Sequence, residues 1–318
     1  MNILITGASG AVAHYLIDYL QRTQPEAPLC GISRTPPRTI ARERLVHHFC
    51  VDMAFDVVPT IQKIIDDVKP DIVFHLASMA NVRDSFDRPA YYLDNNIQST
   101  AKLYEAIRRS KSRPTVMLAS TSEVYGAAKE SDNPIKETQV FAPINPYAIS
   151  KVVQEYIANV YSYYEVPTVI TRAFGYINPL REDLVATSVA KQIVNSENGV
   201  VRVGNLKPVR TFCDVRDIVE AYWLAATRGR PGDAYNIGSE AGIKVKDLVY
   251  ALCDMADRKI VLSQDKNLFR PTDIAVCVPD CSKFKAATGT IASPTGWEPK
   301  IPINESLSWL MESARNAR

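Results

Sequence analysis

The chain has 318 residues, of which 46% are hydrophobic and 23% are charged, and its formal net charge is +2. This length suits one large α/β domain with an appended lobe rather than one minimal domain. The charge is nearly balanced and no block rich in Lys and Arg is present, so nucleic acid is not an expected partner. Every apolar run is far shorter than the roughly 18 residues that would span a bilayer, and no membrane association is expected.

The six cysteines are scattered through the chain, and only Cys277 and Cys281 lie close together in sequence. No Cys or His pair at the spacing of a zinc finger accompanies them, so we predict reduced thiols and no metal site. The chain enters a strand-like run at residues 2–6 without a basic leader, which predicts no signal peptide and a cytoplasmic location.

The first unit is an apolar run at residues 2–6, a glycine turn and an amphipathic helix. This order predicts the first half of a βαβ unit. Glycines let the backbone turn tightly and approach a diphosphate, which then binds the N–H groups at the start of the helix. The predicted contacts in this turn are Gly7, Ser9, Gly10, Ala11 and Val12.

Two further strands are predicted at residues 28–33 and 46–52. In dinucleotide folds the end of the second strand meets the adenosine ribose, where an acidic residue suits NAD and an Arg accommodates the 2′-phosphate of NADP. Ser33 and Arg34 therefore favour NADP, with NAD still possible; the alternative interpretation of Arg34 is an exposed loop side chain. Asp52 and Met53 follow the third strand, where they are placed to flank an adenine ring.

The alternation of strands and helices continues with strands at 71–78, 113–120 and 168–174 and helices at 60–68, 94–109 and 146–164. This alternation predicts an α/β fold with a Rossmann-type, doubly wound parallel sheet. Beyond residue 175 the elements become shorter and less regular. We therefore predict a dinucleotide-binding domain at 1–175 and a mainly substrate-binding lobe at 176–318 that is interleaved with the sheet.

Four side chains near the fifth strand have the pattern of an acid–base site: Thr121, Glu123, Tyr147 and Lys151. Tyr147 and Lys151 are four residues apart and so share one face of a helix. An ammonium beside a phenol stabilises the phenolate, which predicts a lowered pKa for Tyr147. Ligands of open parallel sheets collect at the carboxyl ends of the strands, where Thr121 and Glu123 are expected. Alone, the Tyr–Lys spacing would equally describe a solvated helix face.

Taken together, these motifs resemble the extended short-chain dehydrogenase/reductases that act on nucleotide sugars. The resemblance rests on the glycine turn, HLAS at 75–78, TSEVYG at 121–126 and PYAISK at 146–151. The C-terminal segments GNLKPVRTFCDVRDIVEAYW, RPTDIAV and TGWEPKIPINESL are similar to those of the group containing GDP-mannose 4,6-dehydratase and GDP-6-deoxy-4-keto-mannose reductase. The residues 290–295, which precede TGWEP, look like an insertion that lengthens a surface loop.

The resemblance implies that Tyr147 takes the proton from a sugar 4-OH while Lys151 holds the nicotinamide ribose, and that Thr121 bonds the same sugar oxygen. It places Asn96 near the ribose. Leu76, Ala77 and Ser78 would line the ribose–nicotinamide side of the cofactor.

Glu123 separates the reactions within this group. Loss of water across C5–C6 needs a base for the C5 proton and an acid for the departing 6-OH, and one carboxyl can serve as both. The Thr-Ser-Glu triplet at 121–123 matches the dehydratase pattern, although some 4-keto-sugar reductases and decarboxylases share it. The alternative interpretation of Glu123 is a carboxylate that caps the next turn.

The resemblance also implies contacts with the nucleotide sugar. Arg210 and Arg270 match arginines that clamp the diphosphate, for which a bidentate guanidinium is suited. The pattern F-N-x-x-G-P reads Phe174-Gly175-Tyr176-Ile177-Asn178-Pro179 here, so the Asn and the Gly are effectively exchanged. The full set of predicted substrate contacts is Ser122, Asn178, Val185, Lys191, Asn205, Arg210 and Arg270. For Lys191 and Asn205, a solvated helix face and a turn position explain the residues equally well.

The leading hypothesis is therefore a GDP-hexose 4,6-dehydratase that uses NADP as an internal hydride carrier. A 4-keto-6-deoxy-sugar reductase that consumes NADPH is the second, and a nucleotide-sugar 4-epimerase the third. A non-catalytic dinucleotide sensor is the alternative of a different class, supported by the exchanged Asn and Gly and by Ala13 in place of a third glycine. The family resemblance also implies a homodimer, or a tetramer, built through a four-helix interface of the helical segments 91–109 and 147–164.

Overall fold

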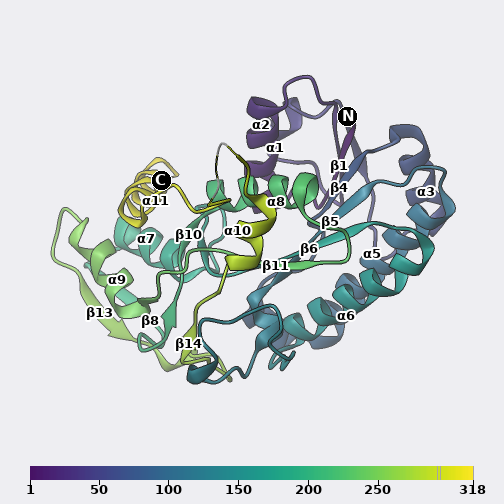
Figure 1. Cartoon of the computed structure of the whole chain (residues 1–318). Coiled ribbons are helices and arrows are strands. Elements are labelled where there is room, and N and C mark those ends of the chain that lie inside the picture. Colours follow the sequence, from purple (N-terminus) through teal and green to yellow (C-terminus); the bar gives the residue numbers. More distant parts are fainter. Residues whose placement is uncertain (292, 294, 318) are drawn as a thin grey trace.

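The computed structural model describes residues 1–318 except 292, 294 and 318. A seven-stranded sheet, all of it parallel, forms the larger part of the molecule (Figure 1). Its strand order is β11-β6-β5-β4-β1-β2-β3. The bounds are β1 Ile3–Thr6, β2 Leu29–Ser33, β3 His47–Cys50, β4 Ile72–His75, β5 Thr115–Thr121, β6 Thr168–Ala173 and β11 Ala234–Ile237. The predicted doubly wound parallel sheet is confirmed.

Helices cover both faces of this sheet, as apolar strands in a parallel sheet require. One face packs against α1 (Ala11–Thr23) and α8 (Val215–Arg228), and the other against α3 (Val58–Val68), α5 (Pro89–Arg109) and α6 (Pro146–Tyr161). The short helices α2 (Thr39–Glu43), α4 (Val82–Asp87) and α10 (Ser282–Thr288) complete this part of the molecule. The sheet therefore has a buried core on each side.

The strand order reverses direction between β1 and β4, since β2 and β3 lie to one side of β1 and the later strands lie to the other. Open α/β sheets bind ligands in the crevice at such a switch point, beyond the carboxyl ends of the strands. The turns after β1, β4 and β5 all open onto this crevice. The predicted acid–base residues Thr121, Tyr147 and Lys151 line the same crevice.

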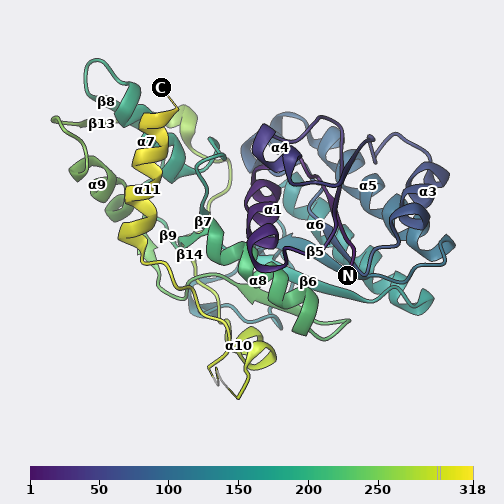
Figure 2. The same cartoon turned by 90° about the horizontal axis from the view of Figure 1, so that it is seen from above.

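The remaining elements form a smaller lobe beside the carboxyl ends of the strands (Figure 2). Its own apolar core lies among α7 (Val185–Asn195), α9 (Val245–Asp254), α11 (Ile303–Asn316), β8 (Val200–Val203) and β13 (Val261–Gln264). Short strand pairs join it to the sheet domain: β7 (Tyr176–Ile177) with β10 (Cys213–Asp214), and β9 (Val209–Arg210) with β12 (Ile243–Lys244) and β14 (Val276–Cys277). Four 3₁₀ turns are η1 (Ser122–Tyr125), η2 (Glu130–Asp132), η3 (Ser162–Tyr164) and η4 (Lys266–Leu268).

The chain returns to the large sheet after it has built part of the small lobe. Strand β11 pairs with β6 at the sheet edge, and α8 packs with α1 on one face. The boundary at residue 175 thus stays a prediction, because residues on both sides of it build the sheet.

Three helix limits differ from the predicted ones. Helix α3 begins at Val58 rather than at residue 60. Helix α5 begins at Pro89 rather than near residue 94, because a proline is already set to helical φ at the first position. Helix α6 ends at Tyr161, and residues 162–164 tighten into a 3₁₀ turn before Glu165 takes a left-handed φ of 58°.

All six cysteines are free thiols in the structure. In the described part of the chain, no helix is both long and apolar enough to cross a membrane, and no group of three or more His, Cys, Asp or Glu side chains could hold a metal ion. The predicted insertion at 290–295 falls partly outside the described residues, since 292 and 294 are not among them.

Candidate active site

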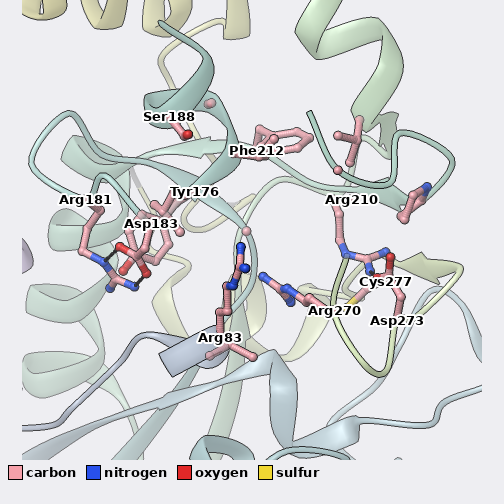
Figure 3. Close-up of a pocket in the computed structure, with 18 of the residues that line it drawn as sticks. Arg83, Tyr176, Arg181, Asp183, Ser188, Arg210, Phe212, Arg270, Asp273 and Cys277 are labelled. Atoms are coloured by element: carbon pink, nitrogen blue, oxygen red, sulfur yellow. Dashed lines mark hydrogen bonds and ion pairs between the residues drawn. The ribbon is translucent and has the colours of Figure 1, made fainter. Parts of the chain in front are cut away.

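Two cavities meet at the carboxyl ends of the strands. The strand-end cleft, of about 390 Å³, lies over the turns after β1, β4 and β5. The inter-lobe cavity, of about 490 Å³, lies between the sheet and the small lobe (Figure 3). Seven residues line both cavities: Ala80, Asn81, Thr121, Tyr147, Ala173, Tyr176 and Arg181. A ligand in one cavity can therefore reach a ligand in the other at Thr121 and Tyr147.

The glycine turn forms one wall of the strand-end cleft. Gly7 has a left-handed φ of 70°, and a Cβ there would lie 2.8 Å from the backbone nitrogen of Ala77, so glycine is required. Gly10 donates its N–H to the Gly7 carbonyl oxygen at 2.8 Å and directly precedes α1. The predicted contacts that line this cleft are Gly7, Gly10, Ala11, Val12, Leu76, Ser78, Tyr147 and Lys151.

The predicted ribose and adenine contacts lie at or just after the ends of β2 and β3, and none of them lines the strand-end cleft. The Oγ of Ser33 is buried and donates to the Thr35 carbonyl oxygen, and the Oγ of Ser9 accepts a hydrogen bond from Thr35 at 3.3 Å. Arg34 is exposed, with its guanidinium 3.9 Å from the Asp52 carboxylate and 3.0 Å from the Tyr91 hydroxyl. Met53 is buried in the core between the sheet and α3.

Asn96 lies behind the cleft rather than on its wall. Its side chain is fully buried and bonds both the N–H and the carbonyl oxygen of Met79, at 2.7 and 3.0 Å. It also donates to the Ser150 hydroxyl at 2.8 Å. Asn96 thus joins the loop after β4 to α6, while Ala77 in that loop donates to the Thr6 hydroxyl. Direct contact of either residue with a cofactor stays a prediction.

Helix α6 presents Tyr147 and Lys151 to the cleft. The helix begins immediately after Asn145, whose side chain accepts the Ala148 N–H at 2.7 Å, a typical N-cap. The Lys151 ammonium donates to the Ala119 carbonyl oxygen of β5 at 2.8 Å and lies 5.8 Å from the centre of the Tyr147 ring. Both side chains are buried. The predicted pairing on one helix face is therefore present in the fold.

The expected direction of the Tyr147 pKa is corrected by the structure. Burial, with a further contribution from Tyr176, raises the pKa of the Tyr147 phenol well above its ordinary value, and Arg181 and Thr121 only partly oppose this shift. Burial also lowers the pKa of the Lys151 ammonium to about 7, against a smaller opposing effect of Glu155. Desolvation of a buried group thus outweighs the neighbouring charges that the helical spacing suggested.

Glu123 lies in the inter-lobe cavity with both carboxylate oxygens bonded. The Asn145 amide donates to Oε2 at 2.9 Å, and the Arg270 guanidinium lies 3.2 Å from Oε1. The backbone N–H of Glu123 bonds the Thr121 hydroxyl at 3.3 Å. The start of α6 and the small lobe therefore hold this carboxylate, and the strand end holds the backbone of the same residue.

The other arginine that sequence singled out, Arg210, is also paired. Its guanidinium lies 2.9 Å from the Asp273 carboxylate, which also accepts the Asn205 amide at 2.8 Å. Ser122 and Val185 line the same cavity. The Lys191 ammonium is ion-paired with Glu182 and does not appear in the lining.

The exchanged Asn and Gly have a structural cause. A Cβ on Gly175 would lie 2.2 Å from the Thr211 carbonyl oxygen, so no larger residue fits there without backbone movement. The Asn178 side chain is fully buried and accepts the Leu180 N–H at 2.9 Å, while its Nδ2 has no partner among the described residues. Asn178 therefore shapes the turn after β7 and does not line either cavity.

Several residues of the site carried no recognisable signal in the sequence. Arg181 lines both cavities, pairs with Asp183 at 2.6 Å and donates to the Ala80 carbonyl oxygen. Arg83 of α4 lines the inter-lobe cavity and donates to the Asn267 carbonyl oxygen of η4. The spacing Arg181-Glu-Asp183 could have suggested the ion pair, but nothing marked its position between the two cavities.

A glycine turn at the switch point and a Tyr–Lys pair on the helix beyond β5 define an α/β protein of the dinucleotide-binding class. The chain belongs to the family described as GDP-mannose 4,6 dehydratase, whose family model matches residues 4–309.

Known proteins similar to the chain carry several different activities. The GDP-6-deoxy-D-mannose reductase of Pseudomonas aeruginosa is 29% identical over 312 residues, covering 96% of this chain and 94% of the relative. The GDP-mannose 4,6-dehydratase of Vibrio cholerae is 27% identical, covering 95% and 90%. Several dTDP-glucose 4,6-dehydratases, including that of Salmonella typhimurium at 23% identity over 99% and 94%, also match.

Solved structures cover the whole fold. RMD from Pseudomonas aeruginosa, complexed with NADPH, has a TM-score of 0.83 and 27% identity over 100% of this chain and 99% of the other. A UDP-glucose 4-epimerase of Thermotoga maritima, solved with UDP-glucose, has a TM-score of 0.86 at 24% identity over 100% and 99%. The second match establishes the fold only.

Proposed function

We propose that the protein is a nucleotide-sugar-modifying enzyme that depends on a nicotinamide dinucleotide and acts as a GDP-hexose 4,6-dehydratase. The observation that carries this proposal is the position of Glu123. Its carboxylate lies in the inter-lobe cavity with Thr121 and Tyr147, which also line the strand-end cleft. Elimination after oxidation needs such an additional carboxyl beside the Tyr–Lys pair.

The strand-end cleft fits a dinucleotide. The close approach of Gly7 to Ala77 leaves no room for a side chain, and the start of α1 offers backbone N–H groups to a diphosphate. Gly10, Ala11 and Val12 would hold the diphosphate. When bound, the nicotinamide would take a hydride from C4 of the sugar and return it at C6. Arg34, exposed at the end of β2, supports NADP over NAD.

The Tyr–Lys pair would carry the first proton transfer. The Tyr147 phenolate would take the proton of the sugar 4-OH, and Thr121 would bond the same oxygen. Because burial raises the pKa of Tyr147, its phenolate needs a nearby cation, and Lys151 on the next helical turn is placed to supply it. In this proposal Lys151 also bonds the nicotinamide ribose.

Glu123 would carry the elimination. A ketone at C4 acidifies the C5 proton, which the Glu123 carboxylate would remove, and the resulting carboxyl would protonate the departing 6-OH. Asn145, which donates to Oε2, would keep the carboxylate aimed at the cavity through both steps. Arg210 and Arg270 would bind the diphosphate, and Val185 and Asn205 would border the nucleotide.

Purified protein incubated with GDP-mannose tests this proposal. Formation of a 4-keto-6-deoxy product without added NADPH is the expected result, because the hydride returns to the sugar. Strict consumption of NADPH on a 4-keto-6-deoxy substrate, with no elimination, would refute the dehydratase proposal. UDP-glucose and dTDP-glucose in parallel reactions test the choice of nucleotide.

The second candidate function is an NADPH-dependent reductase of a GDP-4-keto-6-deoxy sugar. It is favoured by the similarity to the Pseudomonas aeruginosa reductase over 96% of this chain and 94% of that one. The Glu123 contacts also suit it, since both carboxylate oxygens are bonded by Asn145 and Arg270. The same incubations separate the two functions, because only the reductase consumes added NADPH.

We also propose that the enzyme is a homodimer formed through α5 and α6. Helix α6 and the turn after it expose Ile149, Tyr156, Val160 and Tyr163, with Tyr163 88% exposed. Two copies of such a face bury each other in an isologous contact. Light scattering should give twice the chain mass of 35.4 kDa, and Tyr156→Glu should shift the protein to monomers.

A further inference from the structure

Among the charged groups of the inter-lobe cavity, three of five arginines are already paired. Arg210 pairs with Asp273, Arg270 with Glu123 and Arg181 with Asp183, at 2.9, 3.2 and 2.6 Å. The other two lining arginines are Arg83 and Arg202, and neither has a carboxylate partner in the described part of the chain. These two are therefore the cations whose charge is available to an anionic ligand.

Arg83 and Arg202 lie at different parts of the cavity. Arg202 is on β8, which packs within the small lobe. Arg83 is two residues from Asn81 and three from Ala80, both of which line the strand-end cleft as well. Arg83 therefore follows in sequence the residues at the junction of the two cavities, on the wall that the sheet domain contributes.

The Arg83 side chain crosses from one wall of the cavity toward the other. It starts from α4 of the sheet domain and donates one N–H to the Asn267 carbonyl oxygen in the small lobe. Figure 3 shows Arg83 and Arg270 extending into the same part of the cavity from different elements. A guanidinium has five N–H donors. Most of the Arg83 donors therefore remain free for a ligand that lies between Arg83 and Arg270.

Gly175 and Thr211 also line this cavity. A Cβ at Gly175 would lie 2.2 Å from the Thr211 carbonyl oxygen, so no donor side chain can stand at position 175, where the family pattern has an Asn. A diphosphate there would need its donors from the arginines that line the cavity. A planar guanidinium is suited to two phosphate oxygens at once.

We propose that Arg83 is a diphosphate-binding residue of the nucleotide-sugar site. It supplies this site with a positive charge that no carboxylate in the described part of the chain neutralises. This inference rests on the proposed function. Arg83 binds the diphosphate directly, whereas Arg210 and Arg270 must first exchange a carboxylate partner for it. Loss of Arg83 should therefore weaken binding of a nucleoside diphosphate and leave binding of the matching nucleoside unchanged.

Isothermal titration of the full-length protein with GDP, UDP and dTDP, and with the matching nucleosides, tests the inference. Arg83→Gln should lower the affinity for the nucleoside diphosphate that wild type binds best by at least ~10-fold. Arg83→Lys should restore part of this affinity. Arg22→Gln is the matched control: Arg22 is exposed on α1, pairs with Asp18 and lies outside both cavities. It should bind like wild type.

The outcomes distinguish the two proposals. Wild-type affinity for the diphosphate in Arg83→Gln would overturn the role of Arg83 and leave the proposed function intact. An equal loss for diphosphate and nucleoside would also overturn it, because the effect would then not come from the phosphates. A wild-type protein that binds none of the three diphosphates would refute the nucleotide-sugar function and, with it, this inference.

Discussion

The Glu123 carboxylate and the Arg270 guanidinium lie 3.2 Å apart and join the end of β5 to the small lobe. Both residues were predicted to serve the substrate, but in different ways: Glu123 as acid and base, and Arg270 as a diphosphate ligand. The Arg270 guanidinium cannot bind the diphosphate fully while it is paired with the Glu123 carboxylate. Binding of the diphosphate should therefore draw Arg270 away and free an oxygen of Glu123 for the sugar.

Replacement of Glu123 by Gln should separate oxidation from elimination. The amide keeps the shape of the carboxylate but cannot take the C5 proton, so formation of the 4-keto-6-deoxy product should fall by ~10²-fold or more. C4 oxidation should persist, and reduced nicotinamide should accumulate on the enzyme and be visible in its absorbance. A reductase would show nearly normal turnover in this variant, which would contradict the role given to Glu123.

Replacement of Tyr147 by Phe should abolish turnover and spare cofactor binding. The lost hydroxyl is the proposed base for the 4-OH, and general acid–base groups contribute ~10²–10⁴-fold to rates. The ring still fills its buried position, so the fold should be kept. Turnover assays together with titration of NADP check both parts. Retained turnover would refute the assigned role.

Lys151 should make stability depend on pH. Burial lowers the pKa of its ammonium from 10.5 to about 7 in the fold, so between these values the unfolded chain binds more protons. The free energy of unfolding should therefore rise with pH in this window, by up to ~1.4 kcal/mol per pH unit. The loss of stability caused by burying the Lys151 ammonium is complete below about pH 7, and it is absent above pH 10.5.

Denaturant unfolding of wild type and Lys151→Met at pH 7 and pH 9 measures this effect. The wild type should gain stability at pH 9 relative to the variant, since methionine has no proton to lose. An equal pH response of the two proteins would show that Lys151 keeps its ordinary titration in the fold.

Beneath the site, Glu155 and Arg172 form an ion pair at 2.8 Å with exposures of only 2% and 7%. Glu155→Gln leaves the Arg172 charge buried without its partner and should cost ~3–5 kcal/mol of unfolding free energy. The exposed pair of Lys63 and Asp67 at 2.9 Å is the control, and Lys63→Ala should cost less than ~1 kcal/mol. Thermal or denaturant unfolding of both variants decides whether burial makes the difference.

The sequence predicted the parallel sheet and its order of elements well, because apolar periodicity and glycine turns are local signals. It also brought Tyr147 and Lys151 to one helix face. Charge pairing was not predictable, since Arg270 meets Glu123 across 147 positions of chain. The pKa shift of Tyr147 was predicted in the wrong direction. The spacing in sequence reveals a neighbouring ammonium, but only the fold reveals how deeply the phenol is buried.

The exchange of Asn and Gly at 175–178 shows the same limit from another side. The sequence showed that the family pattern was broken, but the reason lies in the Thr211 backbone, which approaches Gly175 from a later segment. Likewise, Arg83 and Arg181 carried no motif. Their positions in the site follow from the way the small lobe folds against α4 and the strand ends.

The place of β11 at the sheet edge has a consequence for how the protein can be made. Its partner β6 ends at Ala173, but β11 does not begin until Ala234. During synthesis the edge of β6 therefore stays unpaired while some sixty further residues leave the ribosome. A fragment ending at residue 175 would keep that open edge permanently and would be prone to aggregate. Expression of the sheet domain alone should thus include the segment through β11.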